Sequence, residues 1–357
     1  MKQDTEVYLV VGGEGFLGRR IVEALIEQKS KTNPGYKSSE IRVADLRMTY
    51  PDPTGYEFYQ ADICNKERLI EIIKTNGSTV TTVFHTASPI MKAPKELHKK
   101  VNIDGTKSLL EACEECGIKN FIYTSSASVV YSGKPLVNVD ETIPYANPFA
   151  DYYSETKAVA EKMCLEANSP NGMKVVALRP SGIFGPGDRQ TTPGALIAQK
   201  KGYPVLFQVG SNTALFDFTY VDNLVDAHLA ASNKLIEGSD IGGNVFFITN
   251  DQPIGMWSFL RMIWAGVGDT REPKIIIPDW LAAFILVALN LLSSVGLIKH
   301  EIPFVFGMTF TDRYFNINKA KKLLDYKPTV SYKEGVPLAV ASTLNRWKEE
   351  EKQNKTN

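Results

Sequence analysis

Short apolar runs and stretches with helical periodicity alternate from residue 7 to about residue 184. One stretch, 19–26, carries the apolar stripe of an amphipathic helix. Four runs have the length of buried strands: 7–11, 41–45, 56–60 and 121–124. Strands that alternate with helices form parallel sheets, because each helix returns the chain to the same end of the sheet. The pattern predicts an α/β fold with a Rossmann-type, doubly wound parallel sheet.

The chain continues well beyond this alternation. Its 357 residues exceed one compact Rossmann unit and predict two lobes. Glycines and prolines at 186–194 mark the crossing between the lobes. We expect a nucleotide-binding domain of residues 1–184 and 215–250, a smaller discontinuous α/β substrate lobe of residues 185–214 and 251–330, and a C-terminal helix and polar tail at 331–357.

A glycine-rich turn separates the first predicted strand from the first predicted helix. It reads Gly12-Gly13-Glu14-Gly15-Phe16-Leu17-Gly18. A strand, a glycine turn and a helix in this order form the context of a dinucleotide-binding fingerprint, in which a tight turn, close approach of a pyrophosphate and close helix packing require glycine. The helix N-terminus attracts the phosphates. The spacing is G-x-x-G-x-x-G rather than G-x-G-x-x-G, and a purely structural turn is the alternative.

Acidic residues end the next two predicted strands. Asp45 can bond the adenosine ribose and would repel a 2′-phosphate, which favours NAD over NADP. Arg47 could instead bind that phosphate, so NADP stays the alternative. Asp62 is placed to reach the adenine amino group, or to cap the helix that begins near Asn65. An ordinary helix cap is also the alternative for Asp45.

Tyr153 and Lys157 lie four residues apart and therefore share one face of a predicted helix. A tyrosine with an ordinary pKa of about 10 is a poor base, but a neighbouring ammonium and the positive nicotinamide of an oxidised cofactor together favour its phenolate. Tyr153 can then take a proton from an alcohol while hydride leaves carbon for a nicotinamide. The serine pair after the strand at 121–124, Ser125 and Ser126, can hold the alcohol oxygen. The motif is common alone, but with the glycine turn it predicts an oxidoreductase of alcohols and ketones.

These motifs resemble the extended short-chain dehydrogenases/reductases and, within them, the 3β-hydroxysteroid dehydrogenase/isomerase group. The resemblance covers nearly the whole chain and is strongest to the sterol-4α-carboxylate 3-dehydrogenases (decarboxylating) of fungi. The segments that carry it are GGEGFLG at 12–18, VFHTASP at 83–89, VNIDGTKSLLEAC at 101–113, FIYTSSASVVY at 121–131, YYSETKAVAE at 152–161, LRPSGIFGPGD at 178–188, FDFTYVDNLVDAH at 216–228 and YFNINKAKKLLDYKP at 314–328. The chain departs at Ser128 and Val130, where family members often have glycine nearby.

The resemblance implies oxidation of the 3β-hydroxyl of a 4α-carboxysterol to the ketone with loss of CO₂, in ergosterol-type sterol biosynthesis. It implies that Tyr153 is the base and that Lys157 binds ribose and tunes Tyr153. Ser126 would hold the substrate oxygen, with Ser125 as the near alternative. The residues expected at the cofactor are Gly12, Gly15, Phe16, Leu17, Gly18, Asp45, Asp62, Ile63, Ala87, Ser125, Tyr153, Lys157, Pro180 and Ile183.

The same residue set fits other activities. A 3β-hydroxysteroid or hydroxyflavonoid-type oxidoreductase without decarboxylation would share it, as would a sugar-nucleotide epimerase or an NAD(P)-sensing regulator without turnover. The intact Ser126, Tyr153 and Lys157 argue against the regulator, and a long apolar segment argues against the epimerase. The resemblance also allows a homodimer and contacts with other enzymes of sterol C4 demethylation.

That apolar segment, 280–298, carries no charge. At about 1.5 Å per residue it approaches the thickness of a bilayer. A full crossing is disfavoured, because it would separate 314–328 from the lobe to which the resemblance assigns them. We expect an in-plane or re-entrant helix at the cytosolic face of the endoplasmic reticulum membrane. The alternative is a buried helix of the substrate lobe in a cytoplasmic protein.

Charge and cysteine content narrow the remaining classes. The net charge is zero and no basic cluster carries interleaved aromatic residues, which argues against nucleic acid as a partner. Cys113 and Cys116 form a C-x-x-C within a predicted helix, without a second pair at zinc-ligand spacing. We expect them to pack in the core rather than to bind metal or react. His85 is expected to pack near the cofactor edge rather than to act as a base, and His228 is expected to be structural.

Overall fold

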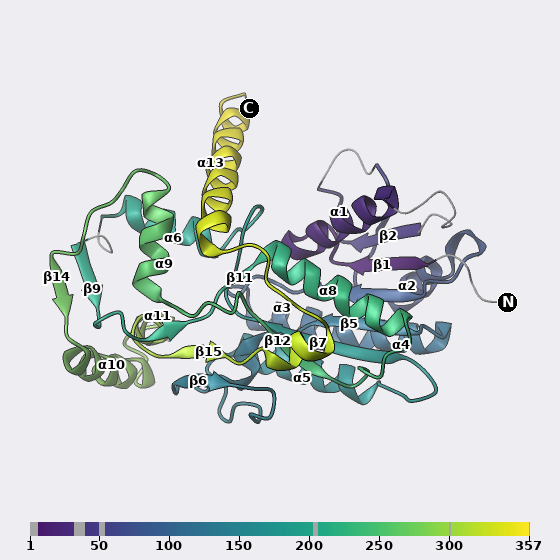
Figure 1. Cartoon of the computed structure of the whole chain (residues 1–357), viewed down its shortest axis with the longest axis horizontal. Coiled ribbons are helices and arrows are strands. Elements are labelled where there is room, and N and C mark those ends of the chain that lie inside the picture. The colour runs from purple at the N-terminus through teal and green to yellow at the C-terminus, as the bar shows by residue number, and fades with distance from the viewer. Residues whose placement is uncertain (1–5, 32–39, 50–53, 203–205, 300, 357) are drawn as a thin grey trace.

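The computed structural model describes residues 6–31, 40–49, 54–202, 206–299 and 301–356. Its centre is a seven-stranded sheet of order β12-β7-β5-β4-β1-β2-β3 (Figure 1), in which every neighbouring pair is parallel. The strands are β1 (Val7–Val11), β2 (Glu40–Asp45), β3 (Glu57–Gln60), β4 (Thr82–His85), β5 (Asn120–Thr124), β7 (Lys174–Pro180) and β12 (Val245–Ile248). The predicted doubly wound parallel sheet is confirmed.

Helices cover both faces of this sheet. On one face lie α1 (Phe16–Lys31) and α8 (Val221–Ile236), and on the other α2 (Lys66–Ile73), α4 (Thr106–Cys116) and α5 (Tyr152–Glu166). Between β4 and α4 the chain forms α3 (Lys95–His98) and a π-helix, η2 (Lys99–Gly105). Two short 3₁₀ turns, η1 (Thr75–Gly77) and η3 (Ala127–Val130), complete this part of the chain.

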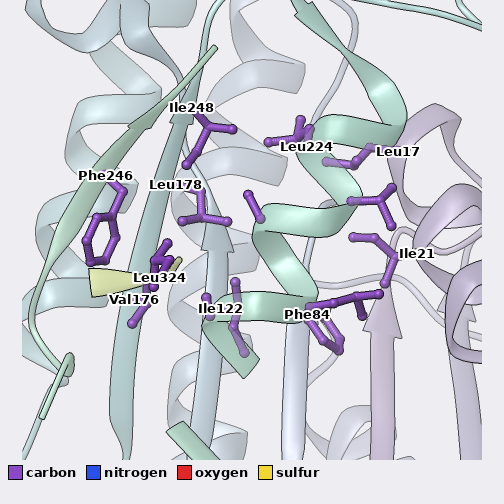
Figure 2. Close-up of a cluster of buried hydrophobic side chains, with 14 of the residues drawn as sticks. Leu17, Ile21, Phe84, Ile122, Val176, Leu178, Leu224, Phe246, Ile248 and Leu324 are labelled. Carbon is purple, nitrogen blue, oxygen red and sulfur yellow. The ribbon is translucent and has the colours of Figure 1, made fainter. Parts of the chain in front are cut away.

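Alternate strand residues supply two separate cores, because successive side chains in a strand point to opposite faces. In β1, Tyr8 and Val10 pack toward α1 and α8, whereas Val7 and Leu9 pack toward α2 and α4. Figure 2 shows the first of these cores, with Leu224 of α8 facing the strands beside α1. The continuous apolar runs of the sequence therefore belong to strands that are buried on both faces.

Most of the remaining elements lie on the side of the molecule away from β1 and β2 (Figure 1), whereas α12 (Asn318–Leu323) packs on the parallel sheet beside β12. A four-stranded sheet of order β13-β10-β15-β6 joins them to the parallel sheet, and two strand pairs, β8 with β11 and β9 with β14, lie beside it. The strands are β6 (Leu136–Val139), β8 (Ile183–Phe184), β9 (Phe207–Val209), β10 (Leu215–Phe216), β11 (Thr219–Tyr220), β13 (Ile254–Gly255), β14 (Ile275–Ile277) and β15 (Arg313–Phe315). The helices are α6 (Thr191–Lys200), α9 (Met256–Ala265), α10 (Asp279–Ser294), α11 (Glu301–Gly307), α12 (Asn318–Leu323) and α13 (Tyr332–Thr356).

The apolar segment 280–298 lies on the surface. Helix α10 occupies most of it, and only Ala282 and Ser293 of this helix are buried. The alternative of a buried helix is therefore wrong. Across the described residues, no helix combines the length and the hydropathy that a bilayer crossing requires. At the C-terminus, α13 continues through the segment expected as a polar tail, and Asn357 lies outside the described residues.

A buried ion pair fixes α5 on the sheet. The Arg179 guanidinium on β7 donates from Nε to Oε2 of Glu161 at 3.0 Å and from Nη2 to Oε1 at 2.6 Å. The Tyr145 hydroxyl donates to the same carboxylate at 2.7 Å. The side chains of Arg179 and Glu161 expose 4% and 0% of their surface. Because α5 also carries Tyr153, this pair sets where the phenol lies relative to the strand ends.

Arg179→Met is expected to lower the free energy of unfolding by about 3–5 kcal/mol, because it leaves the Glu161 carboxylate buried without its cation. Urea denaturation of the purified protein measures the change. The double variant Arg179→Met/Glu161→Leu should recover most of the loss, since no unpaired charge remains. A single variant as stable as the wild type would show that Glu161 does not depend on Arg179.

Candidate active site

The glycine turn packs so closely that side chains are excluded from it. Gly12 has φ 84°, and a Cβ there would lie 2.7 Å from the backbone of Ala87. A Cβ at Gly18 would lie 2.1 Å from the carbonyl oxygen of Gly12. The Gly15 N–H donates to that carbonyl at 3.0 Å, and Gly15 itself is exposed. The turn therefore brings the start of α1 against the loop after β4 and leaves its outer backbone open to a ligand.

The other residues expected at the cofactor lie on several elements around the glycine turn and the strand ends. Phe16 is half-buried and close to Gly187, where a Cβ would lie 3.4 Å from its ring, while Leu17 is buried in the core. Ile63 packs against Gly105 of η2. Pro180 ends β7 and Ile183 begins β8. The strands β1, β4, β5 and β7 are neighbours in the sheet, so the loops after their carboxyl ends share one edge, where α/β sheets bind ligands.

Two carboxylates lie together at the end of β2. Asp45 accepts the Glu14 N–H at 3.0 Å and the Leu46 N–H at 2.7 Å. The Glu14 carboxylate accepts the Thr49 N–H at 2.7 Å, and burial together with the Glu14 charge raises the pKa of Asp45. Arg47 is exposed. Sequence reasoning missed Glu14, which stands inside the glycine turn, because the motif assigns meaning only to its glycines.

The Asp62 carboxylate forms an ion pair with a lysine and does not cap a helix. Its carboxylate accepts from the Lys100 ammonium at 2.8 Å, which lowers the pKa of Asp62, and from the Cys64 N–H at 3.0 Å. Helix α2 is capped by Asn65, whose side chain accepts the Arg68 N–H at 3.0 Å. The cap that the sequence left open for Asp62 is therefore made by Asn65.

Tyr153 and Lys157 occupy the first turns of α5, which Asp151 caps. Lys157 is 2% exposed, and its Nζ donates to the Thr124 carbonyl at 2.6 Å and lies 4.2 Å from the centre of the Tyr123 ring. Burial lowers the pKa of Lys157 to about 7. The two side chains share a helix face, but the ammonium is held by the end of β5.

Burial dominates the electrostatics of the Tyr153 phenol and raises its pKa to about 12. The Ser126 hydroxyl beside it and the positive charge of Arg313 act in the opposite direction. Lys157 donates to the Thr124 carbonyl and is itself desolvated. The expected phenolate depends on Lys157 together with the positive nicotinamide of an oxidised cofactor, and that combined effect stays a prediction.

The two candidate serines have different surroundings. Ser126 is half-buried and next to Tyr153, and its Oγ accepts the Ser128 N–H at 3.2 Å, which caps η3. The Ser125 hydroxyl is buried without a hydrogen-bond partner among the described atoms. Ser128, where the sequence departs from the family pattern, forms a hydrogen bond with Ser126, because the two hydroxyl oxygens lie 2.9 Å apart. Ser126 therefore lies beside the Tyr153 phenol.

Two further polar residues near Tyr153 come from the segment 95–105 and were missed. The His98 ring makes an edge contact with the Tyr153 ring at 5.5 Å, and its Nε2 lies 3.2 Å from the Met91 carbonyl. Asn102, on the π-helix η2, donates to the Thr156 hydroxyl at 3.0 Å, and its Oδ1 has no partner among the described atoms. π-Helical turns recur at functional sites, but no sequence periodicity predicts them.

His85, His228 and Cys113 are buried. His85 lies 2.9 Å from the Thr106 hydroxyl, and burial lowers its pKa to about 3, so its ring is neutral. His228 donates to the Leu224 carbonyl at 2.8 Å, and burial lowers its pKa to about 4. Cys113 is a buried free thiol in the core beneath α4.

Comparison with known proteins supports the same family as the motifs. The model of the 3-beta hydroxysteroid dehydrogenase/isomerase family matches residues 9–278. The chain is 38% identical over 351 residues to the decarboxylating sterol-4-alpha-carboxylate 3-dehydrogenase of Candida albicans, which covers 94% of this chain and 97% of that protein. It is 39% identical over 340 residues to the protein of that name from Mus musculus, covering 93% and 90%.

Solved structures with a similar fold include enzymes of other specificity. MoeE5 in complex with UDP-glucuronic acid and NAD has a TM-score of 0.70 at 21% identity, covering 96% of this chain and 99% of that one. The structure of gox2253 has a TM-score of 0.75 at 23% identity, covering 96% and 98%. These similarities support the fold, and the family follows from the sequence matches. The chain belongs to the 3-beta hydroxysteroid dehydrogenase/isomerase family, as its motifs predicted.

Proposed function

We propose that this protein is an NAD-dependent, decarboxylating sterol-4α-carboxylate 3-dehydrogenase. The observation that carries the proposal is the Tyr153 phenol, placed beside the Ser126 hydroxyl at the carboxyl end of β5. The relatives from Candida albicans and Mus musculus bear this activity in their names and are similar over most of the chain. The proposed substrate is a 4α-carboxysterol with a free 3β-hydroxyl, and the product is the 3-ketone without the carboxyl group.

The reaction needs few groups from the protein. Ser126 orients the 3-oxygen, and Tyr153 accepts its proton as the carbon–hydrogen bond at C3 breaks. NAD, when bound, supplies the hydride acceptor and places a positive ring near the phenol, which opposes the effect of burial on the Tyr153 pKa. The resulting β-keto acid then loses CO₂, because the electron pair of the breaking bond moves to the C3 oxygen as an enolate. Tyr153 can return its proton to that oxygen.

The residues around the glycine turn fit NAD. The turn offers exposed backbone at Gly15 and the N-terminus of α1 to a pyrophosphate. Asp45 would accept the ribose hydroxyls, and Glu14 adds a second carboxylate beside it. Two negative charges there disfavour a 2′-phosphate more strongly than Asp45 alone would.

The proposed function is tested by incubating purified protein with NAD and a 4α-carboxysterol. We expect NADH to form together with a sterol ketone that mass spectrometry shows to have lost CO₂. Tyr153→Phe is the matched control, because it removes one hydroxyl and should slow turnover by at least about 10²-fold while leaving the NAD affinity nearly unchanged. A ketone that keeps its carboxyl group would reduce the activity to that of a plain 3β-hydroxysteroid dehydrogenase.

The two serines should respond differently to pH. The sterol is oxidised by the phenolate form of Tyr153, so kcat/KM should rise with pH toward the raised Tyr153 pKa. Ser126→Ala should lower kcat and displace this rise to higher pH, because the Ser126 hydroxyl lowers the Tyr153 pKa. Ser125→Ala, the control, should change either quantity less. If Ser125→Ala displaced the profile and Ser126→Ala did not, the role would belong to Ser125.

Cofactor choice should depend on the carboxylates at the end of β2. We expect wild type to prefer NAD, and Asp45→Ala to narrow the ratio of kcat/KM for NAD and NADP by about tenfold or more, because it removes a charge that repels the 2′-phosphate. Glu14→Gln, which preserves shape, should narrow it less. Kinetics with both cofactors measures these ratios. A wild-type preference for NADP would indicate that Arg47 binds the phosphate.

We also propose that the outer face of α10 docks on a lipid bilayer, at the cytosolic face of the endoplasmic reticulum. Phe284, Val287 and Leu291 follow one another at helical spacing and expose 71, 68 and 66% of their surface. Ile275 and Ile276 of the preceding strand are also exposed, at the same end of the molecule (Figure 1). Burying such a side chain gains about 1.5–3 kcal/mol. A sterol partitions into lipid, so a bilayer is the occupant that also delivers the substrate.

The double variant Phe284→Lys/Val287→Lys should lose binding to phosphatidylcholine vesicles in a flotation assay, because two apolar contacts become charges. Val137→Lys/Leu338→Lys is the matched control, since these side chains are exposed by 55 and 52% on other elements. The control should float like the wild type. If wild type does not float but forms a dimer that the α10 variant abolishes, the face is covered by a second copy of the chain.

A further inference from the structure

A second hydroxyl, that of Ser128, lies behind the candidate serine. Ser128 belongs to η3, the 3₁₀ turn that Ser126 caps, and exposes 4% of its surface. Its Oγ lies 2.9 Å from the Ser126 Oγ, and its backbone N–H donates to the same oxygen at 3.2 Å. The hydroxyl and the N–H of Ser128 therefore converge on the Ser126 hydroxyl.

The 3₁₀ turn holds Ser128 in this place. The Ser126 carbonyl accepts the Val129 N–H at 3.2 Å, and the Ser128 carbonyl accepts the Tyr131 N–H at 3.0 Å. All residues of the turn are buried, and the Val129 carbonyl accepts the Ala146 N–H at 2.9 Å. Within the described part of the chain, the Ser128 hydroxyl has Ser126 as its only hydrogen-bond partner. Its proton therefore has one acceptor.

A count of protons gives the direction of the bond between the two serines. A serine hydroxyl has one proton to donate and two acceptor positions. Burial raises the pKa of Tyr153, and hydrogen bonding by the Ser126 hydroxyl opposes this effect, as it does when it donates to the phenolate. The Ser126 proton is then committed to the reacting oxygens. The hydrogen bond between the serines must therefore run from Ser128 to Ser126.

We propose that Ser128 is a positioning residue for the Ser126 hydroxyl. The inference rests on the proposed function, in which Ser126 orients the 3-oxygen and Tyr153 accepts its proton. The N–H and the O–H of Ser128 fill both acceptor positions of Ser126, so the Ser126 proton is left to point at the reacting oxygens. Without the Ser128 hydroxyl one position opens, and Ser126 can turn and accept from the sterol hydroxyl instead of donating to its oxygen.

The same contact strengthens Ser126 as a donor. A hydroxyl that accepts a hydrogen bond is polarised by it, and linked hydrogen bonds reinforce one another in an interior of low dielectric constant. Negative charge lies on the Tyr153 oxygen before the proton moves, and on the C3 oxygen when CO₂ leaves. Ser128 thus acts on the reaction through Ser126 rather than by touching the substrate.

The test is a double-mutant cycle with NAD and a 4α-carboxysterol. Ser128→Ala should lower kcat by about five- to tenfold, the effect of one hydrogen bond, and should displace the rise of kcat/KM to higher pH. In protein that already carries Ser126→Ala, the change Ser128→Ala should alter kcat by less than about twofold, because the hydroxyl that it orients is gone. The NAD affinity and the unfolding temperature of Ser128→Ala should stay close to those of wild type.

A second pair of variants keeps the test decisive if Ser128→Ala does not fold. Ser128→Thr and Ser128→Val have the same shape and differ in the hydroxyl, so the threonine variant should turn over faster by a similar factor. Ser232→Ala is the control, because it removes a buried hydroxyl on α8 that has no hydrogen-bond partner among the described atoms. It should leave kcat and the pH profile unchanged.

The outcomes separate the inference from the proposed function. An unchanged kcat in Ser128→Ala, or an equal loss with and without Ser126, would refute the positioning role while the dehydrogenase stands. If wild type oxidises a 3β-hydroxysterol without the carboxyl group but not the carboxysterol, the decarboxylating function fails, and the same cycle with that sterol decides the role of Ser128. If wild type oxidises neither sterol with NAD or NADP, the proposed function and the role of Ser128 both fail.

Discussion

The position of α5 on the parallel sheet is the constraint on which the candidate site depends. Two buried polar contacts set it, the Glu161–Arg179 ion pair to β7 and the Lys157 hydrogen bond to the Thr124 carbonyl of β5. Apolar packing would hold the helix against the sheet but would tolerate small rotations. Charged groups in a dry interior tolerate far less, because any rotation leaves them unpaired. These two contacts therefore fix the position of Tyr153 beside the strand ends.

The sequence predicted those parts of the site that are local in the chain. The strand, turn and helix around Gly12 and the pairing of Tyr153 with Lys157 follow from spacings of a few residues. Arg313 could not be found this way, because its contact with the Tyr131 ring is made only when β15 pairs beside β6. The burial that raises the pKa of Tyr153 could not be predicted for a related reason. Helical spacing reports which residues are neighbours, but not how deeply they are buried.

The apolar segment illustrates the same limit. An uncharged run at 280–298 is compatible with a helix inside a lobe and with one that faces lipid, since periodicity does not say what covers a face. The fold decides the matter in part, because α10 lies at the edge of the molecule with Phe284 and Leu291 outward. Exposed apolar side chains gathered on one helix mark an interaction surface, and the bilayer is the partner that we propose for it.

The central claim is that oxidation at C3 precedes the loss of CO₂ from the same sterol. It is tested most directly with a 4α-carboxysterol that carries deuterium on C3, by following the deuterium and the CO₂ together. The account predicts one deuterium in the reduced cofactor for each CO₂ released, and a slower reaction than with hydrogen at C3 if the transfer limits the rate. CO₂ released without deuterium in the cofactor would contradict it, because the carboxyl group would then leave without the ketone.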